Sequence, residues 1–190
     1  MINSECAGYQ NTNLNNLLRI GGNMINTEML RLIKAFEGMN DKQFATIQKH
    51  CEELNYEKGD KLFTEGDSAS HLWNVIKGQV DLRFEMPDKR KTSSDHTIAS
   101  VDVGKGGAES MVLGWSCFIP PFKMRLSAYC MTNTCTIVKI PKEALLQLFA
   151  KDSLMGYKFM SYMMTVVGYR FQQFQDHVAK NMGEDLMSGW

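Results

Sequence analysis

The chain has 190 residues, 44% of them hydrophobic, which is enough for one ordinary domain and a long helix but too little for two full domains. Lysine and arginine total 21, and aspartate and glutamate also total 21, so the net charge of zero gives no general attraction to nucleic acid. No apolar run reaches the roughly 18 residues of a membrane span, and the N-terminus lacks the pattern of an export signal. We therefore expect a cytoplasmic protein that does not enter the membrane, with its five scattered cysteines as free thiols.

The first part of the chain predicts a polar arm followed by two short helices. Residues 1–23 are rich in asparagine and glycine, and we expect them to form a flexible arm. A helix is expected from Thr27, which suits an N-cap, and its apolar stripe ends before Gly38. A second helix should begin near Asp41. Its inward face would consist of Phe44, Ile47 and Cys51.

Residues 54–140 change to short segments separated by turn signals such as Gly-Asp. In one segment Val80, Leu82 and Phe84 alternate with polar residues, which is typical of a half-buried strand. The last strand material is expected in residues 125–140. The pattern predicts an α+β fold, an antiparallel β-roll (a double-stranded β-helix, jelly-roll-like) flanked by N-terminal helices and a long C-terminal helix.

Helical periodicity returns after Pro141, first in a short amphipathic segment and then in a long one. In the long segment, apolar residues recur three or four positions apart. This spacing predicts a helix that packs on its own domain, on a second copy of the chain, or on both. The candidates for the dimer interface are Met160, Met163, Val167, Phe171 and Phe174.

The order of helices, glycine turns and strands resembles the cyclic-nucleotide-binding domain of the catabolite-activator (CRP/FNR) superfamily. Residues 56–67 and 71–80 carry the resemblance most specifically, and their glycines suit tight turns. The resemblance covers about residues 24–179. It implies a sensor module with a ligand pocket inside the roll.

In that family, a short cassette holds the cyclic phosphate with backbone N–H groups and an Arg, and the ribose hydroxyl with a Glu. The matching residues here are 113–128, with Trp115 at the Glu position and Leu126 at the Arg position. Arg125 is adjacent, but on a strand its side chain would point to the opposite face. Two prolines also remove backbone donors from the loop. The candidates for the ligand pocket are Gly114, Trp115, Ser116, Arg125, Leu126, Ser127 and Ala128.

Several side chains have more than one interpretation. Trp115 either lines the pocket or fills the space that a nucleotide would occupy. Arg170 either reaches a ligand in the roll, forms an ion pair, or is a charge on the solvated side of the helix. Cys130 and Cys135 would face opposite sides of one predicted strand, and no Cys or His spacing fits a metal site. The scattered histidines favour solvated or capping roles over haem ligation.

These observations predict a regulatory sensor or interaction module that is not an enzyme and has no cofactor beyond an unidentified small ligand. We expect weak binding of cAMP and cGMP, and no DNA binding because few residues follow the long helix. The alternative is a genuine cAMP or cGMP receptor related to the CRP/FNR transcription regulators. The expected partners are a second copy of the chain, through the C-terminal helix, and a small molecule or partner protein. The expected segments are an arm at 1–23, a cyclic-nucleotide-binding-like domain with its leading helices at 24–150, a dimerisation helix at 151–182 and a tail at 183–190.

Overall fold

The computed structural model describes residues 25–85, 97–104 and 111–188, with side chains described as far as Gly183. The predicted arm at 1–23 lies outside these residues. In chain order the elements are α2 (Thr27–Arg31), η1 (Lys34–Phe36), α3 (Asp41–Gln48), β1 (Glu52–Glu57), β2 (Lys61–Phe63), β3 (His71–Lys77), β4 (Gln79–Arg83), β5 (Thr97–Asp102), β6 (Val112–Leu113), η4 (Trp115–Phe118), β7 (Ser127–Cys130), β8 (Thr134–Pro141), α4 (Lys142–Lys151) and α5 (Ser153–Ser188).

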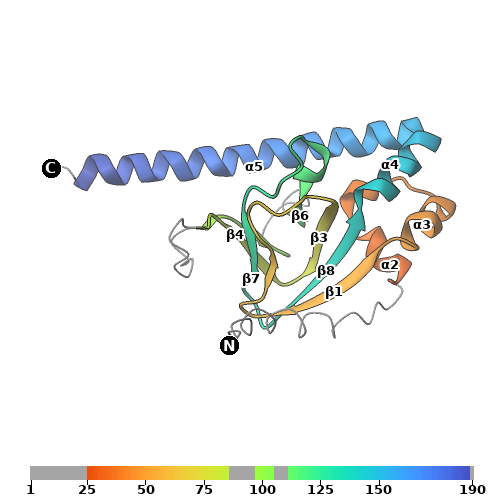
Figure 1. Cartoon of the computed structure of the whole chain (residues 1–190), viewed down its shortest axis with the longest axis horizontal. Helices are drawn as coiled ribbons and strands as arrows, with labels where there is room; N and C mark the ends of the chain where they lie inside the picture. The colour runs from red at the N-terminus through yellow and green to blue at the C-terminus, as the bar shows by residue number, and fades with distance from the viewer. Residues whose placement is uncertain (1–24, 86–96, 105–110, 189–190) are drawn as a thin grey trace, which may run out of the picture.

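The strands form two four-stranded sheets, and every pairing within them is antiparallel. One sheet has the order β1-β8-β3-β6 and the other β2-β7-β4-β5. The two sheets form the walls of a roll, with the short helices at one end and α5 across the top (Figure 1). This arrangement confirms the predicted β-roll between flanking helices.

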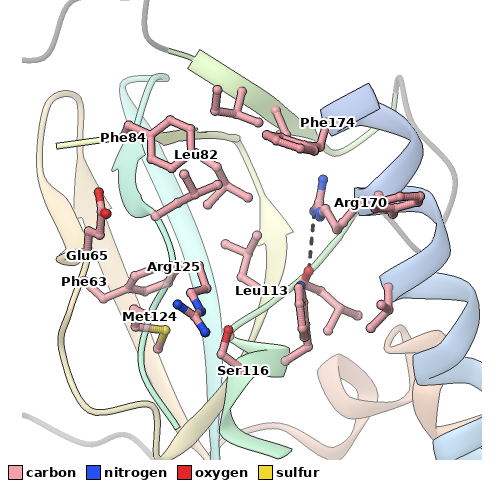
Figure 2. A pocket seen from close by; sticks show the side chains of 18 residues that line it. Phe63, Glu65, Leu82, Phe84, Leu113, Ser116, Met124, Arg125, Arg170 and Phe174 are labelled. Carbon is pink, nitrogen blue, oxygen red and sulfur yellow. Dashed lines mark hydrogen bonds between the residues drawn. The ribbon is translucent and has the colours of Figure 1, made fainter. Parts of the chain in front are cut away.

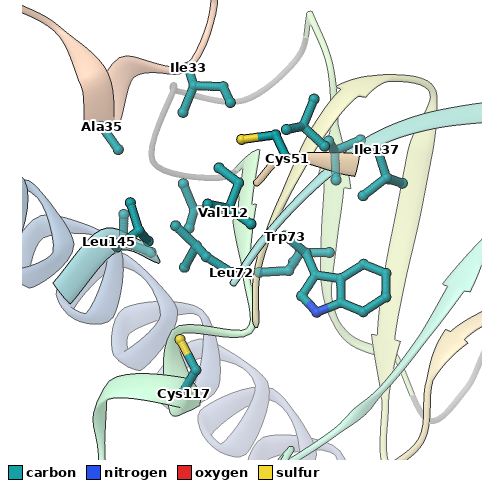
Figure 3. Close-up of a cluster of buried hydrophobic side chains, with 14 of the residues drawn as sticks. Ile33, Ala35, Cys51, Leu72, Trp73, Val112, Cys117, Ile137 and Leu145 are labelled. Atoms are coloured by element: carbon teal, nitrogen blue, oxygen red, sulfur yellow. The ribbon is translucent and has the colours of Figure 1, made fainter. Parts of the chain in front are cut away.

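One hydrophobic core joins the roll to its helices. In Figure 3, Ile33 from the leading segment and Leu145 from α4 lie around the strand residues Leu72 and Val112. All four side chains are at most 4% exposed. Full burial of an aliphatic side chain of this size contributes roughly 1.5–3 kcal/mol, so the helices are held firmly against the sheet.

The leading helices are shorter than the sequence pattern suggests. Asn26, and not Thr27, is the N-cap of α2, because the Asn26 side chain accepts a hydrogen bond from the Glu28 backbone N–H at 3.0 Å. Thr27 instead donates to Gln48 on α3. Phe44 and Ile47 face inward as predicted, at 3% and 1% exposed. Cys51 is also buried, but it lies after α3, which ends at Gln48.

Helix α5 begins at Ser153 and continues to Ser188, beyond the predicted end at residue 182. Its first half lies against the domain and its second half extends past the strands (Figure 1). The first half is fixed by Phe159, which is fully buried and whose ring lies 4.8–6.0 Å from the rings of Phe36, Phe118 and Phe149. Within the described ranges, α5 included, no helix is both long and apolar enough to cross a membrane.

Candidate functional site

The cassette segment begins at a glycine that no other residue can easily replace. Gly114 has a φ of +73°, and a Cβ added there would lie 2.8 Å from the His71 carbonyl oxygen and 2.8 Å from Cδ1 of Trp73. The chain then turns into η4, where Cys117 is fully buried. The Phe118 ring packs edge-on against Phe159 of α5, with 5.9 Å between the centroids. The cassette is therefore attached directly to the long helix.

A cavity of about 520 Å³ lies between the strands, the cassette and α5. Its size falls in the usual range for small-molecule sites. Figure 2 shows its side chains converging from both sheets and from the helix. Most of the lining is apolar. The lining residues are Phe63, Glu65, Leu82, Phe84, Ile98, Ala99, Val112, Leu113, Gly114, Trp115, Ser116, Met124, Arg125, Leu126, Val167, Arg170, Phe171 and Phe174.

Five of the seven pocket candidates line this cavity, namely Gly114, Trp115, Ser116, Arg125 and Leu126. Trp115 is half-buried beside open space, so it lines the cavity and does not fill it. The expectation that Arg125 would point away was wrong. Residues 125 and 126 form a bend before β7 begins, so strand alternation does not apply to them, and both side chains face the cavity.

The remaining two candidates, Ser127 and Ala128, are fully buried in β7 and do not line the cavity. The Ser127 hydroxyl accepts a hydrogen bond from the Glu65 backbone N–H at 2.9 Å and donates one to the Glu85 carboxylate at 2.5 Å. Both roles of this hydroxyl are therefore taken by the protein itself.

Glu85 is the centre of a polar cluster beside the cassette. Its carboxylate also accepts hydrogen bonds from the Lys61 ammonium at 2.7 Å and the Tyr129 hydroxyl at 2.8 Å. Burial acts to raise the pKa of Glu85, but the hydrogen bonds from Lys61, Ser127 and Tyr129 outweigh it and lower the pKa to about 2. Glu85 therefore stays ionised next to Ser127 at neutral pH, and its charge is paired with that of Lys61.

Two charged residues outside the seven pocket candidates also line the cavity, Glu65 and Arg170. Glu65 follows β2, and its carboxylate accepts a hydrogen bond from the Glu85 backbone N–H at 2.8 Å. Arg170 comes from α5 and is only 8% exposed, so the interpretation of Arg170 as a solvated charge was wrong. A usable signal was the spacing of Met163, Val167, Arg170 and Phe174, which places all four on one side of a helix.

The predicted interface stripe combines two faces of α5. Met163 is 5% exposed and belongs to the core of its own domain, while Val167 and Phe174 line the cavity. An overlapping set, which shares Met160 and Phe171 with the predicted one, forms an exposed apolar stripe at spacings of three, four or seven residues along the outer side of the helix. Phe171 also borders the cavity. This outer stripe consists of Tyr157, Met160, Met164, Phe171, Val178 and Met182, which are 37–72% exposed.

The cysteines are arranged differently from the prediction. A turn separates β7 from β8, so Cys130 and Cys135 lie on different strands and both contact Thr132, through its carbonyl and its hydroxyl. Burial raises the pKa of Cys130 to about 12. Cys51, Cys117, Cys130 and Cys135 are free thiols. In the described part of the chain no group of three or more potential ligands is placed to hold a metal ion.

The predicted half-buried pattern of β4 is also incomplete. Asp81 and Arg83 alternate with the cavity-facing residues, yet both are buried and form an ion pair at 3.0 Å. The hydroxyl of Ser100 donates a further hydrogen bond to Asp81 at 2.7 Å. The outer face of this strand is therefore a buried polar network and not a solvated surface.

Comparisons with known proteins support the fold. A protein from Geobacter metallireducens assigned to the cyclic nucleotide-binding proteins has a TM-score of 0.61 and 24% identity, over 78% of this chain and 99% of its own. A cyclic nucleotide-binding domain from Methylobacillus flagellatus has a TM-score of 0.60 and 22% identity, over 82% and 81%. The sensor domain of the transcriptional regulator DNR from Pseudomonas aeruginosa has a TM-score of 0.59 and 14% identity, over 77% and 91%.

These solved structures are similar in fold alone, given their low identities, and no curated protein matches the sequence. The family model of the cyclic nucleotide-binding domain matches residues 53–152, which is more than half of the chain and contains the strands and the cassette. The chain therefore belongs to the cyclic nucleotide-binding domain family.

Proposed function

We propose that this protein is a regulatory sensor module whose cavity binds a small molecule other than a cyclic nucleotide. The observation that carries the proposal is the mainly apolar cavity of about 520 Å³, which is bounded by the cassette and by α5. Ligand pockets of this kind are typically apolar with a few polar groups. Regulation is favoured over catalysis because the family and its structural neighbours are sensors and regulators.

The polar groups argue against cAMP and cGMP. Trp115 and Leu126 stand where the family has the Glu and the Arg that hold the nucleotide. The Ser127 hydroxyl is already bonded to the Glu65 backbone N–H and to the Glu85 carboxylate. The Glu65 carboxylate, which lines the cavity, would repel a phosphate placed nearby. Desolvating a phosphate without charge-assisted hydrogen bonds costs several kcal/mol. We expect cyclic nucleotides to bind no tighter than roughly 100 µM.

The alternative function is a genuine cyclic-nucleotide receptor. The match to the family model favours it, since that family is named for this ligand. Backbone N–H groups near Gly114 and the two cavity arginines, Arg125 and Arg170, would then hold the phosphate. Measured nucleotide affinity separates the two functions.

We propose that the sensor acts through a dimer in which the α5 helices of two copies of the chain pack against each other. The outer stripe of α5 leaves large apolar side chains exposed, among them Met164 at 70% and Phe171 at 59%. A two-fold mate would bury the same stripe of both copies. The contact between Phe118 of the cassette and Phe159 of α5 offers a direct route from ligand to helix. We propose no DNA contact by this chain, in keeping with its net charge of zero.

The cavity can be tested with a neutral apolar fluorophore, N-phenyl-1-naphthylamine. The native protein should bind it saturably, with about one molecule per chain. Val167→Trp should abolish this binding, because the indole would enter the cavity from α5. Leu154→Trp is the matched control, since Leu154 is 63% exposed on the same helix and belongs to neither the cavity lining nor the outer stripe. A native protein with no saturable binding would exclude the proposed function.

A further inference from the structure

Arg170 places a positive charge in the wall of an apolar cavity. Its side chain enters from α5, on the same side of the helix as Val167 and Phe174, and its guanidinium faces the cavity (Figure 2). The residue is 8% exposed, and burial lowers the pKa of its guanidinium to about 10. The group therefore remains charged at neutral pH in a largely desolvated position.

Among the described residues, Gln173 and Val112 accept hydrogen bonds that orient this guanidinium. Nη1 donates to the Gln173 side-chain oxygen at 2.6 Å, and Nη2 donates to the Val112 carbonyl oxygen at 3.4 Å. Gln173 is one turn further along α5 and only half-buried, so a ligand could displace its amide. An ionised carboxylate makes shorter and stronger hydrogen bonds to a guanidinium than a neutral amide oxygen does.

The surroundings limit what kind of anion fits. Thirteen of the eighteen lining residues are apolar, and they include Leu82, Leu113 and Phe174. Glu65 lies on the opposite side of the cavity from Arg170 in Figure 2 and would repel a second negative charge. Arg125 also lines the cavity but is exposed, so Arg170 is the buried cation of the lining, with hydrocarbon or aromatic surface around it.

We infer that the ligand is an apolar carboxylic acid, with its carboxylate on Arg170 and its hydrocarbon body against the apolar wall. The inference rests on the proposed function, because it requires that the cavity binds a small molecule. The planar guanidinium matches a carboxylate with two parallel N–H···O bonds. A polar ribose and base would leave their hydrogen-bonding groups unsatisfied against the same wall.

The test uses displacement of N-phenyl-1-naphthylamine from the full chain by decanoate and by 1-decanol, both below their aggregation concentrations. These ligands share the hydrocarbon body and differ in the charge at one end. Decanoate should displace the probe at a concentration at least about tenfold lower than decanol, as expected for a charge-assisted hydrogen bond. Equal potency of the two in the native chain overturns the inference, and this comparison needs no variant.

Arg170→Met should weaken decanoate at least about tenfold and leave decanol unchanged, because methionine keeps the apolar bulk and removes the charge. Lys158→Met is the control for loss of a positive charge from the exposed surface of α5. Decanoate affinity that survives Arg170→Met would also overturn the inference. If the probe binds but neither result appears, only the carboxylate inference fails. If the probe itself does not bind, the proposed function fails with it.

Discussion

Replacement of Gly114 by alanine tests how rigidly the cassette is built. Gly114 has a φ of +73°, and a non-glycine residue in this left-handed region costs roughly 1–2 kcal/mol. The new Cβ would also lie 2.8 Å from a backbone oxygen, His71 O, and 2.8 Å from the Trp73 ring. Overpacking of this kind adds about 1–3 kcal/mol. We expect Gly114→Ala to lower the free energy of unfolding by about 2–5 kcal/mol.

Gly59→Ala is the matched control for the backbone term. Gly59 has a φ of +91°, but a Cβ added there would meet no atom within 4 Å. Its cost should therefore be limited to roughly 1–2 kcal/mol. Urea unfolding at one fixed protein concentration measures both variants. Equal losses for Gly114→Ala and Gly59→Ala would refute the close contacts around the cassette.

Three further predictions concern the nucleotide, the helix and the polar cluster. The double variant Trp115→Glu, Leu126→Arg should raise the affinity for cAMP at least about tenfold in calorimetry, because it restores the Glu and the Arg of the family cassette. A double variant that folds but gains no affinity would mean that the backbone of the loop also excludes the nucleotide. Met164→Glu should weaken self-association at least about tenfold in sedimentation, whereas Leu154→Glu, similarly exposed but off the outer stripe, should not. Equal effects of the two variants would exclude the stripe as the interface. Glu85→Gln should destabilise the fold by about 1–3 kcal/mol at pH 6. The pKa of Glu85 is lowered from 4.5 to about 2, so its contribution to the free energy of unfolding is complete above the unfolded-state pKa and declines as pH falls toward 2. The stability difference between the native protein and Glu85→Gln should therefore be smaller at pH 3 than at pH 6. A difference that stays constant between these pH values would contradict the low pKa.

The sequence was sufficient for the roll because its turns are chemically specific. Gly78, for example, has a φ of +91°. A Cβ there would lie 2.6 Å from two atoms at the turn between β7 and β8, Thr132 Oγ1 and Thr134 O. Such positions tie a residue type to a backbone geometry. Helical spacing is less specific, because it groups residues into stripes without naming the surface that each stripe contacts. For this reason the predicted interface combined Met163, which is in the core, with Phe171, which is exposed.

The site was predictable only where it followed the family cassette. Trp115 and Leu126 were pocket candidates because of their position after Gly114, and both line the cavity, although the sequence left open whether Trp115 would line or fill it. Arg125 was misplaced because strand alternation was applied to a bend. Arg170 is 57 residues beyond Leu113 in the chain, and only the packing of α5 against β6 brings it to the cavity. Helical spacing places Arg170 on the same side of α5 as Val167 and Phe174, but it does not say which surface that side contacts.

The most direct test of the central claim is calorimetric titration of the full chain with cAMP and with cGMP. The missing Glu and Arg, together with the occupied hydroxyl of Ser127, predict a Kd no tighter than roughly 100 µM for either nucleotide, or about 5–6 kcal/mol of binding free energy. A Kd in the low micromolar range for cAMP or cGMP would contradict the account and would identify the protein as a cyclic-nucleotide receptor.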